Sequence, residues 1–421
     1  MAHAPAYRAW RLSDPGPAHS TDHRYACMPV VTKRELRAHF PNGFLPPGRD
    51  LDAGLASGEV EFVSTSGTTS ERLVNLWHQP WWNASERASW RLNADADRIA
   101  TGSHREAILA SPLSTGFLSV DRDLPIEERT VERFMYLNYQ FAPGEWTAAY
   151  QDRMADDLAR FKPLVLEANP SLLARFARFL VQNRRSVFQP PLIVLTFEFP
   201  SRLHLRWIRR AFSAPVCSSY GSTETGYVFM ECEAGRFHQN VDFCRVDFQP
   251  WRREHGGPAT GRILVTALGH PWFLLLRYDV GDAVRLEERG PCPCGRDRGL
   301  TLSSIEGRIR DVTFTTAGRA VTVNRLDEAL SAVPGLFTYQ VEQLERSSYL
   351  VHCVGDGTGN GDLAAATAAA LMGVYGEAAR VEPRVTDRIA PEASGKFRLA
   401  KFQEQGEAED LLDPAFPRAS A

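Results

Sequence analysis

The sequence predicts an α/β protein in two parts: a large N-terminal domain with parallel and mixed sheets at 1–309, and a small α+β domain at 310–421. Three observations support this division. Strand and helix patterns alternate between 150 and 217, as they do in parallel sheets. Short strand patterns separated by Gly and Pro fill 240–288, which indicates a small β-rich region. A new pattern of strands and helices then begins after about residue 311.

The parallel part is predicted from five consecutive elements. Apolar residues recur with helical spacing at 150–162 and 171–185. The apolar run at 192–196 is typical of a buried strand, and a helix at about 201–212 leads to the next short strand at 215–217. Strand, helix and strand in this order indicate a parallel α/β unit.

The remaining elements divide between the β-rich region and the small domain. In the β-rich region, strands are expected at 241–248, 261–267 and 273–277. The small domain is expected to contain a hairpin, a helix, two strands, a second helix and a final strand, at 313–322, 324–332, 338–345, 348–354, 361–375 and 379–386.

Length and composition exclude several classes of protein. A chain of 421 residues is too long for one compact core, and 43% hydrophobic with 24% charged residues is typical of a soluble globular protein. The net charge of −3 does not favour nucleic acid as a partner, and no apolar stretch is long enough for a membrane span. The start lacks the apolar region of a signal peptide, and the cysteine count of 7 is odd, so we expect a reducing cytoplasm.

The first candidate motif is the run Ser-Thr-Ser-Gly-Thr-Thr-Ser at 64–70, after a strand-like segment at 61–63. Backbone N–H groups and hydroxyls in such a loop can bind a polyphosphate. The GxxxxGKS/T spacing of a P-loop NTPase is absent. Taken alone, the run is more typical of a flexible loop.

The second candidate motif, Ser-Ser-Tyr-Gly-Ser-Thr-Glu-Thr-Gly, occupies 218–226, directly after a short strand that ends near Cys217. Gly221 allows the backbone to approach a ligand closely. Tyr220 can stack on a purine, and Glu224 can hold Mg²⁺ against phosphate oxygens. An ordinary strand-to-helix turn is the alternative interpretation.

Three shorter motifs follow. Tyr-Asp-Val-Gly-Asp at 278–282 offers a carboxylate that can accept hydrogen bonds from ribose hydroxyls, although alone it is typical of a β-turn. Gly-Arg-Ile-Arg-Asp at 307–311 lies at the predicted boundary, and Ser-Gly-Lys-Phe-Arg occupies 394–398. The chain has only four lysines, and one of them, Lys396, lies in this last motif.

In this order, the five motifs resemble those of the adenylate-forming superfamily, which contains acyl-CoA synthetases and peptide-synthetase adenylation domains. They are similar to that family's S/T-SGTTGxPK, YGxTE, YRxGD, GRxDD and SGKxxR sequences. The run Leu-Arg-Tyr-Asp-Val-Gly-Asp, the following Cys-Pro-Cys-Gly-Arg and the short length look most like the phenylacetate-CoA ligase and coenzyme F390 synthetase branch. The resemblance covers roughly 60–400 and implies that the small domain is mobile.

The resemblance implies activation of a carboxylic acid with ATP and Mg²⁺, and a role for each matching residue. The catalytic residues would be Lys396, which reaches the carboxylate and the α-phosphate, Glu224, which carries Mg²⁺, and Thr223, which contacts the α-phosphate. Asp311 would be the hinge. Residues that close over the phosphates, frame the adenine or hold the ribose would be Ser64, Thr65, Ser66, Gly67, Thr68, Thr69, Tyr220, Gly221, Ser222, Asp282 and Arg308.

Three positions depart from the family pattern. Ser-Glu-Arg at 70–72 stands where the phosphate loop usually has Gly-x-Pro-Lys. Arg310 replaces the first aspartate of GRxDD, which leaves Asp311 as the hinge residue. Thr-Ala-Gly-Arg-Ala at 316–320 replaces a glycine-rich turn after the hinge. In relatives the rotated small domain helps to build the thiol channel, so the use of CoA is an open question.

A second site is predicted from four metal-binding side chains, Cys232, His238, Cys292 and Cys294. Three thiolates and one imidazole suit a tetrahedral structural Zn²⁺. Such an ion would join two loops and take no part in the reaction. The alternative is that the three cysteines are reduced and unpaired, and that no metal is bound.

The acid-binding residues are predicted from composition. Aromatic side chains are frequent between the phosphate loop and Tyr220, and flat apolar walls favour an aryl acid, although aromatic residues more often belong to the core. A benzoate-type acid, such as a hydroxy- or aminobenzoate from natural-product assembly, is the favoured substrate. The candidate substrate-binding residues are Tyr139, Phe141, Phe197, Ser218 and Ser219.

Three functions remain open. The acyl group can pass to the thiol of CoA or of a carrier protein, or it can be joined directly to an amine or hydroxyl as an amide or ester. The third alternative is an inactive binding protein with the same fold. The sequence argues against it, because it retains Glu224, Asp282, Arg308 and Lys396. Homodimers are common in the family, but nothing in the sequence favours or excludes one.

Overall fold

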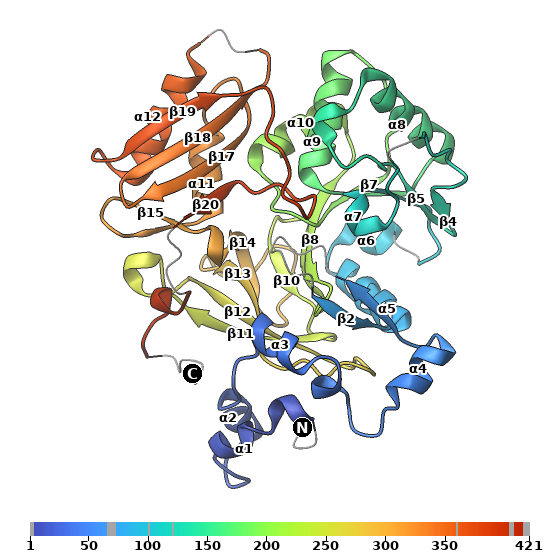
Figure 1. The fold of residues 1–421 in the computed structure, drawn as a ribbon, viewed down its shortest axis with the longest axis vertical. Helices are drawn as coiled ribbons and strands as arrows, with labels where there is room; N and C mark the ends of the chain where they lie inside the picture. The colour runs from blue at the N-terminus through green and yellow to red at the C-terminus, as the bar shows by residue number, and fades with distance from the viewer. Residues whose placement is uncertain are drawn as a thin grey trace.

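The computed structural model describes residues 4–64, 73–99, 102–119, 122–358, 361–403 and 408–415. A large sheet runs through most of the molecule, and a separate small sheet lies at the upper left of Figure 1. The predicted α/β class, with one large sheet and a smaller separate sheet, is confirmed. None of the helices in the described ranges has the length and apolar character needed to cross a bilayer.

The large sheet has twelve strands in the order β11-β12-β13-β14-β10-β9-β8-β7-β6-β3-β5-β4. In its parallel half the strands are β3 (Glu106–Leu109), β5 (Phe134–Tyr136), β6 (Val165–Ala168), β7 (Leu192–Leu195) and the first part of β8 (Val216–Ser222), with β4 (Thr130–Val131) antiparallel at the edge. In its antiparallel half they are β9 (Gly226–Glu231), β10 (Phe237–Gln239), β11 (Cys244–Pro250), β12 (Thr260–Ala267), β13 (Tyr278–Leu286) and β14 (Thr301–Arg308).

Helices cover both faces of the parallel half. Its strands are apolar on both faces, as buried parallel strands are. Along β7, Ile193 packs with α8 (Ala148–Phe161), α9 (Pro170–Gln182) and α10 (Arg202–Ala211). The neighbouring Val194 faces the opposite way, toward Trp90 of α5 (Gln79–Trp90) and Ala96 of α6 (Ala94–Ile99). This half is therefore a three-layer sandwich.

The N-terminal segment packs on the antiparallel half. It contains η1 (Pro5–Tyr7), α1 (Trp10–Ser13), α2 (Thr21–Ala26), α3 (Lys33–His39), η2 (Asn42–Phe44), α4 (Leu51–Ser57) and the hairpin β1 (Glu61–Ser64) with β2 (Val74–Trp77). The strand predicted at 273–277 is absent. Its backbone instead bonds to this segment: Leu274 N–H donates to Phe44 O at 2.8 Å, and the Tyr7 hydroxyl donates to Leu274 O at 3.1 Å.

The small unit follows the predicted order of elements. After η5 (Ile309–Asp311) come β15 (Thr313–Phe314), β16 (Ala320–Val321), α11 (Val323–Leu330), β17 (Leu336–Glu345), β18 (Ser348–Gly355), α12 (Leu363–Tyr375), β19 (Arg380–Val385) and β20 (Ala400–Phe402). Its sheet has the order β19-β18-β17-β20. The other short helices are α7 (Pro112–Thr115), η3 (Pro143–Glu145), η4 (Arg253–His255) and η6 (Ala408–Leu411). The boundary between 309 and 310 stays a prediction.

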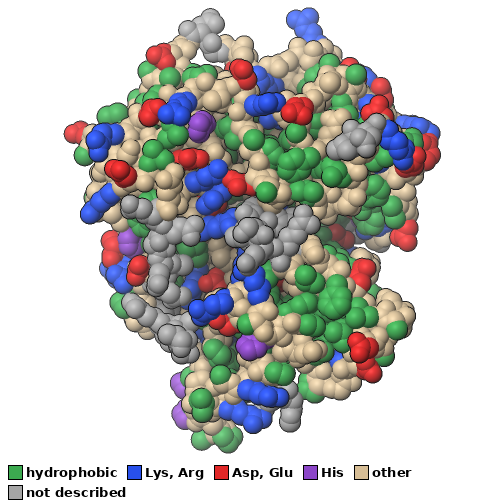
Figure 2. Space-filling model, viewed as in Figure 1, with side chains coloured by type: hydrophobic (Ala, Val, Ile, Leu, Met, Phe, Trp, Pro, Cys, Tyr) green, Lys and Arg blue, Asp and Glu red, His purple; other side chains and the backbone are tan. Residues whose placement is uncertain are grey.

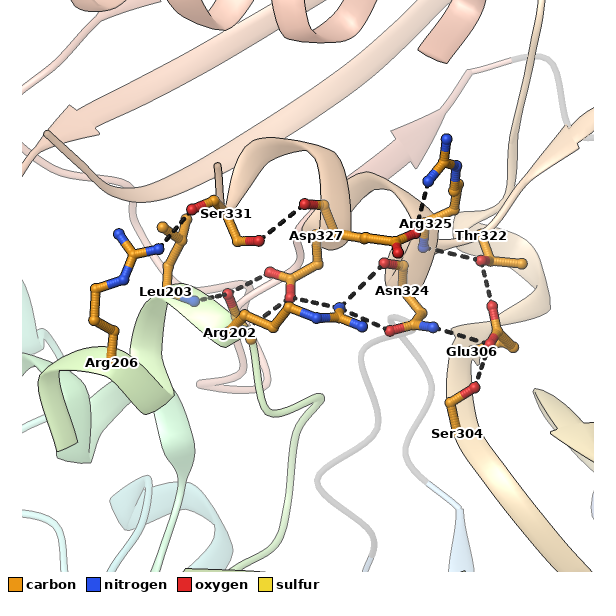
Figure 3. A network of polar contacts seen from close by, with 12 residues as sticks. Arg202, Leu203, Arg206, Ser304, Glu306, Thr322, Asn324, Arg325, Asp327 and Ser331 are labelled. Atoms are coloured by element: carbon orange, nitrogen blue, oxygen red, sulfur yellow. Dashed lines mark hydrogen bonds and ion pairs between the residues drawn. The ribbon is translucent and has the colours of Figure 1, made fainter. Parts of the chain in front are cut away.

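A buried carboxylate joins the small unit to α10 (Figure 3). Asp327 of α11 is 0% exposed and accepts hydrogen bonds from the Ser201 hydroxyl and from Arg202 N–H at 2.8 Å. The Arg202 guanidinium adds an ion pair at 3.2 Å. Leu203, the next residue, is buried in the small unit's hydrophobic core. The small unit is therefore held against the large one by apolar and charged contacts together.

A second carboxylate joins α11 to the large sheet. Glu306 of β14 accepts from the Thr322 hydroxyl at 2.5 Å and from Asn324 Nδ2 at 3.0 Å. Ser304 donates to the same carboxylate at 2.6 Å, as Figure 3 also shows. Both contacts lie near the start of α11, so they fix the direction in which the small unit leaves the sheet.

Candidate active site

The strand β8 changes its partner along its length. Up to Ser218 it pairs in parallel with β7, and from Ser219 to Ser222 it pairs antiparallel with β9. The motif at 218–226 is therefore a β-hairpin, and the strand-to-helix turn, the alternative interpretation of its sequence, is wrong. The hairpin joins the parallel and antiparallel halves of the sheet.

The hairpin tip presents Thr223 and Glu224. A Cβ at Gly221 would lie 2.3 Å from the carbonyl oxygen of Gly226, so glycine is needed for the strands to approach this closely. Glu224 is 7% exposed and accepts a hydrogen bond from the Tyr278 hydroxyl at 3.2 Å. The second and third motifs are thus in direct contact through Glu224 and Tyr278.

Asp282 and Arg308 form an ion pair across two adjacent strands. They are opposite each other on β13 and β14, with Arg308 Nε 3.2 Å from Asp282 Oδ1. The Tyr220 hydroxyl donates to Asp282 Oδ2 at 2.7 Å. The charge of Asp282 raises the pKa of Arg308, which keeps the guanidinium ionised. The structure therefore brings residues from three motifs together, and it assigns the Tyr220 hydroxyl a partner that the sequence did not indicate.

Lys396 lies in a tight turn of the small unit that packs against the large unit. Gly395 has a φ of +78°, and a Cβ there would lie 1.9 Å from Ser111 Oγ and 3.6 Å from the ring of Phe141. Only glycine fits both the backbone conformation and this space. The Lys396 side chain is half-buried next to this contact.

Charged residues of the large unit act on the Lys396 ammonium. Burial lowers its pKa, as does the positive charge of Arg308, while the carboxylates of Glu198, Glu224 and Asp282 act in the opposite direction. The catalytic role of Lys396 stays a prediction.

Glu198 belongs to this site and was not predicted. Its carboxylate accepts from the backbone N–H of Phe397 at 2.6 Å and from the Ser171 hydroxyl at 2.6 Å. Burial raises the pKa of Glu198. The contact holds the turn that carries Lys396. The one signal in the sequence is an acidic residue between two phenylalanines after a buried strand.

The predicted hinge residue Asp311 is paired with the fifth motif. Arg398 Nε donates to Asp311 Oδ1 at 2.6 Å, and Arg310 Nε is 3.7 Å from the same oxygen. Asp311 is 6% exposed. The hinge segment is thus tied to the segment that carries Lys396, whereas the role of Asp311 in a rotation stays a prediction.

The predicted nucleotide loop is described only at its start. Ser64 ends β1. The predicted residues Thr65, Ser66, Gly67, Thr68 and Thr69 lie outside the described residues.

The predicted substrate residues differ in what they offer a ligand. Tyr139 is 1% exposed in the core, and its hydroxyl donates to Asp123 at 2.7 Å. Phe141 is 36% exposed. Phe197 is half-buried with a φ of +73°, immediately before Glu198. Tyr139 therefore has almost no surface to offer a ligand, whereas Phe141 beside the Lys396 turn does.

The two serines of β8 also differ. Ser218 N–H donates to Glu231 Oε2 at 2.9 Å. Ser219 is 8% exposed, and its hydroxyl has no hydrogen-bond partner within the described part of the chain. A buried hydroxyl without a partner is destabilising.

The four predicted metal ligands form one cluster. Cys232 follows β9, His238 is in β10, and Cys292 and Cys294 lie between β13 and β14, with their ligand atoms all within 4.8 Å of one another. The sulfur atoms of Cys232 and Cys292 are 3.7 Å apart, and Cys294 Sγ is 3.2 Å from His238 Nε2. Metal–sulfur bonds of about 2.3 Å in a tetrahedron place sulfur atoms about 3.8 Å apart. The cluster therefore has the size of a tetrahedral zinc site.

Comparisons with known proteins find likeness in structure. No protein-family model matches the sequence, and no curated protein matches it either. A crystal structure of 2-hydroxyisobutyryl-CoA ligase in the postadenylation state, in complex with R3-HIB-AMP, matches with a TM-score of 0.70 and 18% identity over 96% of this chain and 86% of that one. The chain has the fold of the adenylate-forming CoA ligases. An anthranilate CoA ligase in complex with anthranoyl-AMP matches with a TM-score of 0.54 and 13% identity, over 80% of this chain and 65% of that one.

The likeness of this chain to 2-hydroxyisobutyryl-CoA ligase differs among the crystallised states of that enzyme. The same 2-hydroxyisobutyryl-CoA ligase gives a TM-score of 0.56 in an open conformation and 0.53 in the thioesterification state, with 18% and 20% identity. The coverage of this chain is 96% and 95%, so length does not explain the difference. This chain as a whole is therefore more similar to the postadenylation structure than to the other two.

Proposed function

We propose that the protein activates a carboxylic acid with ATP, forming an acyl-adenylate and pyrophosphate. The observation that carries this proposal is the turn of Lys396, which the bond from Phe397 N–H to Glu198 at 2.6 Å holds against the large unit, and whose ammonium is subject to the charges of Glu224, Asp282 and Arg308. The fold supports it, because neighbours with that fold were crystallised with acyl-adenylates. Residues 310–421 act as the small domain that brings Lys396 to the nucleotide.

Each residue contributes to the attack of the carboxylate on the α-phosphorus, which breaks the bond to pyrophosphate. Lys396 holds the substrate carboxylate and an α-phosphate oxygen, so two anions can approach. The Tyr278 hydroxyl orients the carboxylate of Glu224, which would hold Mg²⁺. A cation there would neutralise charge on the phosphate oxygens. Asp282, fixed by Arg308 and Tyr220, accepts the ribose hydroxyls. No general base is needed, because the carboxylate is already ionised at neutral pH.

The favoured acid is of the benzoate type, and the favoured acceptor is the thiol of CoA. The anthranilate CoA ligase was crystallised with an aromatic acyl-adenylate, and the 2-hydroxyisobutyryl-CoA ligase was crystallised with CoA. Phe141 provides an exposed ring near the Lys396 turn, and Ser219 provides an unpaired hydroxyl for a ring substituent. A carrier-protein thiol, or an amine or hydroxyl acceptor, is the alternative for the second step.

The test is ATP–pyrophosphate exchange with a panel of hydroxy- and aminobenzoates and short hydroxy acids. We expect exchange with at least one aryl acid. Exchange with none of the acids would favour an inactive binding protein and contradict the proposal. For an active acid, CoA is then added and the products are analysed by mass spectrometry. An acyl-CoA supports the thiol step, whereas its absence favours an amine or hydroxyl acceptor.

We also propose that the cluster of Cys232, His238, Cys292 and Cys294 holds a structural Zn²⁺. Purified without added metal, the protein should contain about one zinc ion per chain by elemental analysis. Replacing Cys294 with Ser should remove most of the zinc and lower the melting temperature, because the loop between β13 and β14 loses its link to β9 and β10.

The matched control for the zinc test is Cys27→Ser. Cys27 is a free, half-buried cysteine outside the cluster, so its replacement should leave the zinc content unchanged. Protein that contains no zinc, or a Cys294→Ser variant that retains it, would contradict the assignment.

A further inference from the structure

Lys33 is held beside the candidate site by the backbone of the N-terminal segment. Val31 forms a parallel bridge with Tyr278, through backbone hydrogen bonds of 3.1 and 2.9 Å to the two neighbours of that tyrosine. Thr32 then caps α3 in a capping box with Glu35. Lys33 is therefore fixed two residues from the point where the chain meets the tyrosine that binds Glu224. Figure 1 shows α3 near the strands of this half of the sheet.

Lys33 shares its electrostatic neighbours with Lys396. The charges of Arg308, Glu224 and Asp282 act on both ammonium groups. The two lysines come from opposite ends of the chain and from different units. Half-buried, Lys33 makes no hydrogen bond or ion pair with any residue in the described ranges.

The nearby carboxylates do not neutralise these cations. Asp282 is bonded to Arg308 and Tyr220, and Asp311 is paired with Arg398. The Glu198 carboxylate, whose charge acts on Lys396, is already bonded to Phe397 N–H and to the Ser171 hydroxyl, so Glu224 is the carboxylate left to balance the charge of Lys33. By contrast, Lys401 is paired with both Glu392 and Glu342, at 2.9 and 3.6 Å.

An excess of positive charge in a partly desolvated site favours an anionic ligand. Figure 2 shows Lys and Arg side chains near the middle of this face, where the upper and lower parts of the molecule meet. The run at 64–72, of which residues 65–72 lie outside the described part, carries Arg72 but no lysine.

We infer that Lys33 is a phosphate-binding residue of this site, which contacts the β- or γ-phosphate of ATP and the pyrophosphate that leaves. This inference rests on the proposed function. Lys33 and Lys396 then hold the polyphosphate between them, with Lys396 at the α-phosphate and Lys33 toward the leaving group. Lys33 belongs to the large unit, so its contact does not depend on the orientation of the small one.

Binding of Mg²⁺ complexes of ATP and of pyrophosphate, and binding of adenosine, should be measured by calorimetry for the wild type and for Lys33→Ala, Lys33→Arg and Arg34→Ala. We expect Lys33→Ala to weaken binding of ATP and pyrophosphate by at least about tenfold, as loss of one charge-assisted contact does, and to leave adenosine affinity within about twofold. Lys33→Arg should retain most of the affinity. Arg34→Ala, which removes an exposed cation from the same helix, should bind as the wild type does.

Unchanged ATP affinity in Lys33→Ala, or an equal loss for ATP and adenosine, would overturn the inference. An equal loss for ATP and adenosine would mean that the substitution had disturbed the fold, and a fall in the melting temperature of Lys33→Ala below that of the wild type would confirm this. A wild-type protein that binds neither ATP nor pyrophosphate would overturn the proposed function and this inference with it. ATP binding by the wild type with no effect of Lys33 would overturn this inference alone.

Discussion

Replacing Lys396 with Ala should lower the rate of ATP–pyrophosphate exchange by about a hundredfold or more, with the affinity for ATP within about threefold of the wild type. In the proposed mechanism the ammonium bridges the carboxylate and the α-phosphate, where charge changes most during the reaction. The other proposed nucleotide contacts come from residues of the large unit, which the substitution leaves in place. Exchange kinetics with a saturating active acid and equilibrium binding of ATP measure the two quantities separately.

The control for Lys396 is Lys401→Ala. Lys401 lies five positions further along the same segment, but it is paired with Glu392 and Glu342 in the small unit. Its replacement should leave exchange within about threefold of the wild type, because a partly exposed ion pair contributes little. If Lys396→Ala exchanged as fast as Lys401→Ala, the assignment of Lys396 as the catalytic lysine would be wrong.

Replacing Asp327 with Ala should weaken the contact between the small unit and α10 by about 3 kcal/mol, roughly a hundredfold in the docking equilibrium. The side chain is fully buried, and its loss leaves the Ser201 hydroxyl and the Arg202 N–H without their partner. The small unit should then leave its observed orientation more often. Amide hydrogen exchange should become faster around 201–203 and 323–330, and adenylation should slow because Lys396 is less often in place.

Glu328→Ala provides the comparison for Asp327. Glu328 lies on the same helix, but it is 57% exposed and bonds to the equally exposed Arg325 at 2.6 Å. This variant should show wild-type hydrogen exchange and adenylation. Unchanged protection of 201–203 in Asp327→Ala would mean that the apolar contacts of Leu203 hold the small unit without the carboxylate.

Most elements of the small unit could be predicted because each is encoded locally. The alternation of apolar residues at 338–345 and 348–354 is enough to indicate strands, and the structure has β17 and β18 there. The proximity of Asp282 and Arg308 could also be predicted, because each belongs to a recognisable motif, and the two motifs lie on neighbouring strands. The prediction of a strand at 273–277 was wrong because the backbone of these residues bonds to the N-terminal segment, which carries no clear motif.

The rest of the site depends on contacts between distant parts of the chain. Glu198 bonds to a residue 199 positions away, and the bridge of Val31 to Tyr278 joins the N-terminal segment to β13. No local pattern marks such a pair, because a buried acid or a single lysine has the same appearance in many other settings. The change of partner within β8 could not be predicted for the same reason, because it depends on which distant strands lie beside Val216–Ser222.

The position of β8 has a consequence for how the protein loses activity. Because its first half is a central strand of one core and its second half belongs to the other, Tyr220 and Glu224 are supported from both sides. Neither core could loosen alone without displacing the residues at this seam. The proposed nucleotide site therefore depends on both halves, and a fragment containing only one of them would retain part of the sheet but not all the residues of that site.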